Sequence, residues 1–291
     1  MLSPICLFTY NRLSETKLTV EALQMNNLAS KSRLFIFSDA AKLGGNQQKV
    51  IEVRNYLKTI TGFLSVEIFE APVNKGLANS IISGVSEIVH KFGKVIVLED
   101  DLITTPNFLD FMNQSLDFYV NSKNIFSISG YTMDLPSLKN YDKDFYYGYR
   151  ASSWGWGTWK NKWEEIDWQM ADYPTFKWDF LKQIQFMRGG SDLPYMLWKQ
   201  MHGKIDSWAI RWCYNQFKNE LLTVYPAKSK VINIGIGAAA THTKKTKRFF
   251  VFPDQECKIN FKFEEEIALN KQLYQEFKNK FSVISRLKDR F

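Results

Sequence analysis

Apolar and polar residues follow two alternating periods over the first 130 residues of the chain. Short runs of β-branched and aromatic residues, typical of buried strands, stand at "PICLFTY", "RLFIFSD", "SVEIFEA" and "KVIVL". Between and after these runs, apolar residues recur at helical spacing, which predicts helices over 14–28, 46–60, 76–93 and 107–119. This alternation predicts an α/β fold, with a mostly parallel central sheet covered by helices on both faces.

The pattern changes after residue 130. A zone rich in Tyr and Trp comes first, and no repeat or clear linker separates it from the first half. We therefore expect residues 131–255 to pack on the same sheet as residues 1–130. The patterns in this second half predict helices over 193–201 and 208–218 and short strands over 221–225 and 230–235.

The last segment, residues 256–291, is predicted to be an amphipathic helical tail. From Glu264 onward, lysines and arginines separate apolar residues at helical spacing, namely Leu273, Phe277, Phe281, Ile284, Leu287 and Phe291. One interpretation is a helix docked on the core. The other is a basic helix that rests on an anionic membrane surface, as a peripheral contact.

The composition is that of a globular protein with a large core. Of 291 residues, 45% are hydrophobic, yet no stretch reaches the roughly 18 apolar residues of a membrane span. Cys6, Cys213 and Cys257 have no paired spacing, which favours reduced thiols in a cytoplasmic protein over a disulfide framework or zinc site. The opening "MLSPICLFTYNR" lacks the features of a signal peptide and is expected to form the first strand.

The charge balance favours anionic partners. The net charge is +8, and much of the surplus lies in "THTKKTKR" and in the tail. Nucleotides, nucleic acid and an acidic membrane surface all fit such a balance. Ordinary solvated charge is the alternative for any one of these runs.

The most informative stretch is "VIVLEDD", in which an apolar strand ends in Glu99, Asp100 and Asp101. Two like charges about 5 Å apart repel by about 3 kcal/mol at an effective dielectric constant of about 20. A cation is therefore expected beside them, and Mg²⁺ and Mn²⁺ bind carboxylate oxygens and complete their shells with phosphates. Because ligands bind beyond the carboxyl ends of parallel strands, the triplet predicts a metal site that holds a diphosphate.

The other predicted strands also end in polar residues, which would lie at the same edge of the sheet. Asn74 and its neighbours open a helix, whose amino end favours anions. Taken singly, each of these residues suits a cap or a turn, and no Walker loop or GxGxxG motif favours an ATPase or a dinucleotide enzyme. The residues are Thr9, Asn11 and Arg12 after the first strand, Asp39 after the second, and Asn74, Lys75 and Gly76 after the third.

Tryptophans gather in "SSWGWGTWKNKW", where glycines separate Trp154, Trp156 and Trp159. Flat rings pack against the apolar faces of sugars, and interleaved glycines indicate a loop with a close backbone approach. We expect Trp154 and Trp156 to line a donor or acceptor pocket, with core packing as the alternative.

These motifs resemble a known family. "TYNR", Asp39, "NKGLANS" and "VIVLEDDLITTPNFLDFM" resemble the GT-A glycosyltransferases that use nucleotide sugars, in particular the N-acetylglucosaminyltransferase I (family 13) group and related bacterial family 2 enzymes. "IDSWAIRW" and "PAKSKVINIGIGAAATH" extend the likeness more loosely, so that it covers most of residues 1–250. It implies a GT-A fold, with nucleotide-sugar binding in residues 1–130 and the acceptor side in residues 131–255.

The resemblance also implies roles for single residues. Asp101 and His242 would bind the metal, and Glu99 and Asp100 would contact the ribose or donor sugar. Thr9, Arg12 and Asp39 would hold the nucleoside, and Asp206 would be the general base. The family has two adjacent acids where this chain has Asp206 and Ser207, so Glu165 and Asp167 remain rivals for the base. A helix N-cap is the other interpretation of Asp206.

The sequence thus predicts a metal-dependent glycosyltransferase of the hexosyl or N-acetylhexosaminyl type, with Mn²⁺ or Mg²⁺ as cofactor. It would move a sugar, with inversion, from a UDP-sugar to a glycan or lipid-linked acceptor in bacterial polysaccharide or lipopolysaccharide assembly, without nucleic acid as partner. Lys244, Lys245, Lys247 and Arg248 would close over the phosphates. One alternative is a sugar-phosphate nucleotidyltransferase, although "TYNRLSE" lacks its glycine-rich loop. The other is a non-enzymatic carbohydrate or nucleic-acid binder, which leaves the acidic triplet unexplained.

Overall fold

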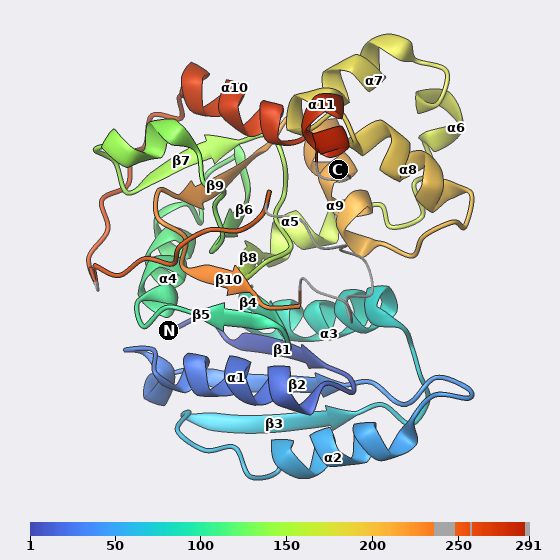
Figure 1. Cartoon of the computed structure of the whole chain (residues 1–291), viewed down its shortest axis with the longest axis vertical. Helices are drawn as coiled ribbons and strands as arrows, with labels where there is room; N and C mark the ends of the chain where they lie inside the picture. The colour runs from blue at the N-terminus through green and yellow to red at the C-terminus, as the bar shows by residue number, and fades with distance from the viewer. Residues whose placement is uncertain (236–247, 257, 289–291) are drawn as a thin grey trace.

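The computed structural model describes residues 1–235, 248–256 and 258–288 (Figure 1). Its centre is an eight-stranded sheet in the order β3-β2-β1-β4-β8-β6-β9-β7. The first half of the chain supplies four parallel strands: β1 (Ile5–Thr9), β2 (Arg33–Ser38), β3 (Ser65–Glu70) and β4 (Lys94–Glu99).

The second half continues the same sheet. Its strands are β6 (Ile125–Ser129), β7 (Phe145–Gly148), β8 (Trp156–Trp159) and β9 (Leu222–Pro226). β8 runs antiparallel to both β4 and β6, β6 and β9 are parallel, and β7 is antiparallel to β9. A small antiparallel pair, β5 (Leu102–Thr104) with β10 (Val231–Asn233), lies beside it. The predicted α/β architecture is confirmed, whereas the boundaries at residues 130 and 255 stay a prediction.

Helices cover both faces of the sheet. Those of the first half are α1 (Leu13–Gln24), α2 (Gln47–Leu57), α3 (Leu77–Phe92) and α4 (Phe108–Phe118). Those of the second half are α5 (Lys160–Glu164), α6 (Tyr173–Phe176), α7 (Phe180–Phe186), α8 (Leu193–Met201), α9 (Trp208–Lys218), α10 (Lys271–Lys280) and α11 (Val283–Lys288). Three short 3₁₀ helices are η1 (Ala29–Lys31), η2 (Pro136–Asn140) and η3 (Met187–Gly189).

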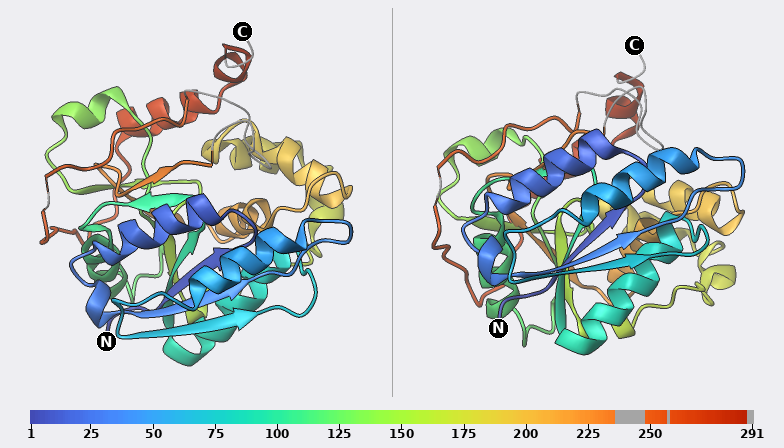
Figure 2. Two further views of the ribbon diagram at one scale, coloured as in Figure 1. Left: turned by 60° about the horizontal axis from the view of Figure 1, so that its bottom comes forward. Right: turned by 90° about the horizontal axis from the view of Figure 1, so that it is seen from below.

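Two apolar cores form because successive strand residues point to opposite faces. Ile5 and Leu7 of β1 join the core under α1, α2 and α4, whereas Cys6 and Phe8 join the core with α3, α8 and α9. Figure 2 shows α1 and α2 on one side of the sheet and α3 on the other. Burial on both faces explains why these strands read as unbroken apolar runs. Cys6 and Cys213 are free and buried, and Cys257 lies outside the described residues.

The tail that the sequence predicts to be helical contains two shorter helices, α10 and α11. Residues 258–270 contain no helix, and Asn270 starts α10 by accepting hydrogen bonds from the backbone N–H groups of Gln272 and Leu273. A second break follows, because Ser282 Oγ accepts a hydrogen bond from the Ser285 N–H and α11 begins there. The docked interpretation holds for α10, whose apolar residues Leu273 and Phe277 are buried with Phe281 in the core.

Within the described ranges, no helix combines the length and the apolar character needed to cross a bilayer.

Candidate functional site

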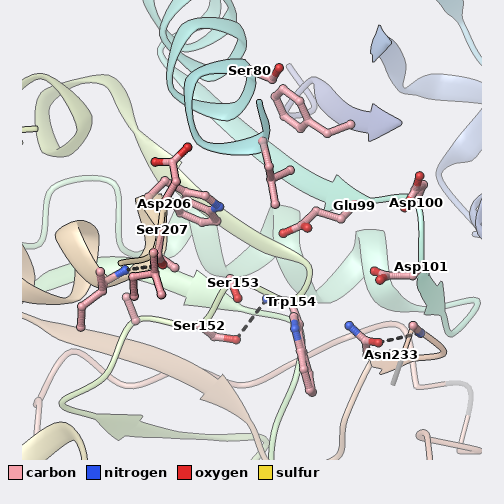
Figure 3. A pocket seen from close by; sticks show the side chains of 18 of the residues that line it. Ser80, Glu99, Asp100, Asp101, Ser152, Ser153, Trp154, Asp206, Ser207 and Asn233 are labelled. Carbon is pink, nitrogen blue, oxygen red and sulfur yellow. Dashed lines mark hydrogen bonds between the residues drawn. The ribbon is translucent and has the colours of Figure 1, made fainter. Parts of the chain in front are cut away.

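A cavity of about 1,030 Å³ opens at the carboxyl ends of β1, β2 and β4. The loops after these strands form one wall, and α8, α9 and the segment before β8 form the other. Figure 3 shows Glu99 and Asp101 pointing into this space, while Asp100 points away from it. The topology thus brings strand ends of the first half against residues of the second half.

An arginine of the chain itself neutralises part of the acidic triplet. Arg12 Nη2 lies 2.5 Å from Asp100 Oδ1 and 3.0 Å from Asp101 Oδ2. The Tyr10 N–H donates a hydrogen bond of 3.2 Å to Asp100 Oδ2. Both oxygens of the buried Asp100 are therefore engaged, which makes Asp100 a residue that positions the triplet.

Two acids of the triplet, Glu99 and Asp100, have raised pKa values. Burial, together with the charges of Asp101 and Asp100, raises the pKa of Glu99 to about 8. Burial also raises the pKa of Asp100 to about 6, against the opposing effect of Arg12. The triplet thus holds a protonated Glu99 at neutral pH beside carboxylates that share Arg12.

The backbone of the triplet is clamped from two sides. Thr19 Oγ1 of α1 donates a hydrogen bond of 2.9 Å to the Asp100 carbonyl, and the Ile234 N–H donates one of 2.9 Å to the Asp101 carbonyl. A Cβ atom on Gly235 would lie 2.0 Å from Asp101 Oδ2. Position 235 therefore accommodates a larger residue only if the Asp101 side chain moves, because the chain after β10 passes directly over the carboxylate.

Asp39 organises the loop that leads into α3. Its carboxylate accepts hydrogen bonds of 2.9 Å from the backbone N–H groups of Ala40, Lys75 and Gly76 and from Asn74 Nδ2. Asp39 and Asn74 line the cavity, whereas the Lys75 side chain is exposed and does not. Asp39 thus shapes the wall in front of the amino end of α3.

Two buried hydroxyl groups in the cavity wall have no hydrogen-bond partner in the described part of the chain. They are Thr9 Oγ1 at the end of β1 and Ser80 Oγ in the first turn of α3. An unpaired buried hydroxyl costs roughly 1–3 kcal/mol, so each is expected to bond to a water molecule or to a polar ligand. The nearby Asn11 and Arg12 also line the cavity.

The tryptophans divide between site and core. Trp154 lines the cavity and packs edge-on against Tyr131, with ring centroids 4.6 Å apart. Trp156 is only 1% exposed and packs against Trp163 and Trp212 in the core. The reason is that Trp156 belongs to β8 and pairs with β4, whereas Trp154 precedes the strand. For Trp156, the core alternative is the one that the structure shows.

Asp206 lies at the cavity on an exposed loop. Its Oδ1 is 3.6 Å from Arg211 Nη2, and its Oδ2 lies close to Gly76 at the start of α3. The N-cap interpretation of Asp206 is wrong, since Ser207 Oγ accepts the capping hydrogen bond from the Ile210 N–H. The Asp206 carboxylate is therefore available to a ligand.

The rival acids lie elsewhere. Neither Glu165 nor Asp167 lines the cavity, and the Asp167 carboxylate accepts hydrogen bonds from the backbone N–H groups of three residues that follow it. His242, Lys244, Lys245 and Lys247 lie outside the described residues. Arg248 is described, and its guanidinium donates a hydrogen bond to the Lys280 carbonyl.

Sequence reasoning missed Arg150. Its guanidinium makes a bidentate ion pair with Asp192, at 2.9 and 3.0 Å, and lies 3.9 Å from the centre of the Phe281 ring. Arg150 and Phe281 both line the cavity. No local pattern marks this residue, because its partners lie far along the chain. Other lining residues missed are Lys42, Lys199, Ser80, Tyr131, Trp208 and Asn233.

The donor set fits a divalent cation only in combination with a substrate. The described residues contain no cluster of three or more His, Cys, Asp or Glu side chains that could hold a metal alone. Asp101 faces the cavity, and one of its oxygens is engaged by Arg12. Mg²⁺ is commonly held by one or two carboxylates together with substrate phosphates, so Asp101 fits that role and Asp100 does not.

No model of a known protein family matches the sequence, and a search of curated proteins finds no significant match. Solved structures do match. Residues 1–349 of S. aureus TarS align over 77% of this chain and 60% of that chain, with 8% identity and a TM-score of 0.41. A longer TarS structure aligns over 44% of this chain and 21% of that chain, with 12% identity and a TM-score of 0.31.

Two further matches are transferases. The galactosyltransferase LgtC, in complex with donor and acceptor sugar analogs, aligns over 73% of this chain and 69% of its own, with 12% identity and a TM-score of 0.37. The mannosyltransferase PcManGT from Pyrobaculum calidifontis, in complex with GDP-Man and Mn²⁺, aligns over 44% of this chain and 35% of its own, with 11% identity and a TM-score of 0.34. At TM-scores of this size the likeness carries no argument for the activity of this chain. Any argument about its activity rests on the geometry of its own cavity.

Proposed function

We propose that this protein is a glycosyltransferase that moves a sugar from a nucleoside-diphosphate donor to an acceptor hydroxyl with the help of Mn²⁺ or Mg²⁺. The observation that carries the proposal is the cavity itself. One wall presents Glu99 and Asp101 beside Arg12, and another part of the lining presents the exposed carboxylate of Asp206, which lies 3.6 Å from Arg211 Nη2.

The donor end lies at the carboxyl ends of β1 and β2. The free hydroxyls of Thr9 and Ser80 are suited to the polar edge of a nucleoside, for which UDP is our choice. Asp39 holds the loop whose backbone leads into the amino end of α3, where N–H groups favour an anion. Lys42 and Lys49 add positive charge to the same part of the lining.

The chemistry follows from what each group supplies. When bound at Asp101, a divalent ion would offset the charge that develops on the diphosphate leaving group. Arg12 fixes the Asp101 carboxylate in the orientation that faces the cavity. Asp206 would accept the proton of the acceptor hydroxyl, and direct attack of that hydroxyl on the donor sugar inverts its configuration.

Sugar recognition falls to the aromatic lining. The Trp154 ring lies at the cavity wall against Tyr131 and Phe249, so one face of a sugar ring can pack on it. The part of the cavity that we assign to the acceptor lies between α8 and α10, and Arg150 is part of its lining. A glycan or lipid-linked acceptor in bacterial polysaccharide or lipopolysaccharide assembly, and a hexosyl or N-acetylhexosaminyl donor, complete the proposal.

A calorimetric titration tests this function. We expect UDP to bind in the presence of Mn²⁺ and to bind at least roughly tenfold more weakly in EDTA. Asp101→Asn should remove this metal dependence, while Asp117→Asn, a change at an exposed carboxylate of α4, should leave it intact. Equal binding of nucleoside diphosphates with and without metal would contradict the proposal. A preference for a triphosphate with a sugar phosphate would point to a nucleotidyltransferase instead.

A further inference from the structure

Large apolar side chains are exposed on the corner formed by α6 and α7. Trp178, Phe180, Leu181 and Ile184 are 71%, 70%, 74% and 63% exposed, and we call these four residues the α7 face. Their spacing places Phe180, Leu181 and Ile184 along one side of α7, and Trp178 lies just before the helix, while Phe186 on the other side of α7 is buried in the core. A helix that leaves its bulkiest apolar residues in water has an unpartnered surface.

Basic residues surround the α7 face. Residues 173–190 contain Lys177, Lys182 and Arg188, all exposed, against the single acid Asp179. Each Lys or Arg close to an anionic bilayer contributes about 1 kcal/mol of attraction. Trp and Phe with flanking lysines are typical of helices that lie in the interface of a membrane.

The C-terminal helix adds to this surface. Val283 and Ile284 of α11 are 56% and 68% exposed. Arg286 Nη2 donates a hydrogen bond of 3.1 Å to Ser191 Oγ, and Ser191 Oγ donates one of 2.8 Å to the Phe281 carbonyl. These contacts hold α11 against the segment that follows α7, and Figure 1 shows both helices at the same end of the molecule. The apolar residues Leu273 and Phe277 of α10 are buried, so within the described tail helices it is α11 that adds exposed apolar area.

The size and the charge of the surface decide which partner it fits. Four such side chains expose roughly 500 Å². A stable dimer or protein complex buries about 800 Å² on each partner, and a second copy would bring the same lysines into contact. A bilayer needs no matching surface of fixed area, because protruding apolar side chains can enter it, and anionic headgroups attract the lysines around the α7 face.

We propose that the α7 face, with α11 beside it, docks on the surface of an anionic lipid bilayer. Trp178, Phe180, Leu181 and Ile184 enter the boundary between headgroups and acyl chains, and Lys177 and Lys182 contact lipid phosphates. The next helix in the chain, α8, lines the cavity with Leu193, Met196 and Lys199. On the proposed function, the acceptor end of the cavity therefore faces acceptors carried by lipids.

Vesicle co-sedimentation tests this surface, and it needs no nucleotide or sugar. The full chain should bind vesicles of phosphatidylcholine with phosphatidylglycerol and bind pure phosphatidylcholine more weakly. Replacing the four residues of the α7 face by Ser should lower the partition coefficient roughly tenfold or more. The matched control, Leu43→Ser with Leu64→Ser and Val73→Ser, changes residues that are 106%, 60% and 67% exposed elsewhere and should bind as the wild type does.

A charge variant gives a second, independent readout. Lys177→Glu with Lys182→Glu alters exposed side chains only, and it should reduce binding to the anionic vesicles while leaving the thermal midpoint unchanged. Wild-type protein that stays in the supernatant, or a serine variant that binds normally, would overturn the proposal. So would a wild-type dimer in sedimentation velocity that the serine variant turns into a monomer. Metal-dependent UDP binding is measured separately, so failure of the proposed transfer leaves this result unaffected.

Discussion

Arg12 lies between the last two acids of the triplet, with Nη2 at 2.5 Å from Asp100 Oδ1 and 3.0 Å from Asp101 Oδ2. The repulsion among three adjacent carboxylates led us to expect a bound cation. The structure shows that a side chain 88 residues away already supplies one positive charge to Asp100. On the proposed function, a metal would therefore be needed only where Asp101 meets a diphosphate, and Asp100 would act by positioning.

The ion pair of Arg12 with Asp100 should contribute to stability. In Arg12→Ala the buried Asp100 carboxylate loses its cation, and we expect the free energy of unfolding to fall by about 2–4 kcal/mol in urea titrations. Arg12→Lys should recover part of the loss, because it restores the charge without the planar guanidinium, whose Nη2 contacts both carboxylates. Lys31→Ala, at an exposed position, serves as control, and a loss below about 0.5 kcal/mol for Arg12→Ala would show that solvent compensates the charge.

The raised pKa of Glu99 predicts a pH dependence of stability in metal-free buffer. Burial raises this pKa to about 8, well above that of an unfolded glutamate, so the folded state binds more protons between about pH 4 and 8. The free energy of unfolding should therefore decrease as pH rises through this window, by up to about 1.4 kcal/mol per pH unit for this group. Glu99→Gln should remove this slope in denaturant titrations at pH 5, 7 and 9. Parallel curves for the two proteins would mean that Glu99 is already ionised at pH 5.

The glycine over the triplet should be irreplaceable. A Cβ atom at position 235 would lie 2.0 Å from Asp101 Oδ2 and 3.0 Å from Arg12 Nη1. Gly235→Ala should therefore weaken metal-dependent UDP binding at least roughly tenfold and lower stability by about 1–3 kcal/mol. In an Asp101→Ala background the stability loss should largely disappear, because the clashing carboxylate is gone. A loss of equal size in both backgrounds would place the strain elsewhere.

Asp206 should affect transfer and not donor binding. Removing a general base typically costs 10²–10⁴ in rate, so Asp206→Asn should lower kcat by about this factor with an unchanged Kd for UDP. Asp167→Asn is the matched control, since Asp167 accepts backbone hydrogen bonds away from the cavity. Transfer by Asp206→Asn at the wild-type rate would remove Asp206 as the base.

Trp154 and Trp156 should respond oppositely to the same substitution. Trp154→Ala removes a ring from the cavity wall, and we expect weaker binding of the sugar substrate with a small change in stability. Trp156→Ala empties a site in the core and should cost about 3–5 kcal/mol of unfolding free energy. Kinetics with a donor sugar and urea titrations separate the two effects. A large stability loss for Trp154→Ala would assign it to packing alone.

The sequence by itself determined most of the elements of the first half, two helices of the second half and the chemistry available at the strand ends. The helices expected over 193–201 and 208–218 match α8 and α9, and the apolar runs match β1, β2, β3 and β4. These features are local, because helix and strand periods act over a few residues. The same locality placed the acidic triplet at the end of β4.

Only the tertiary structure decided which partners those residues have. The strand order places β1 beside β4, which brings Arg12 to Asp100, and inserts β8 next to β4, which buries Trp156 while Trp154 stays at the cavity. It also buries the apolar residues Leu273 and Phe277 of α10 and leaves those of α7 and α11 exposed. The physical reason is that burial and ion pairing depend on contacts between residues far apart in the chain, which local periodicity does not encode.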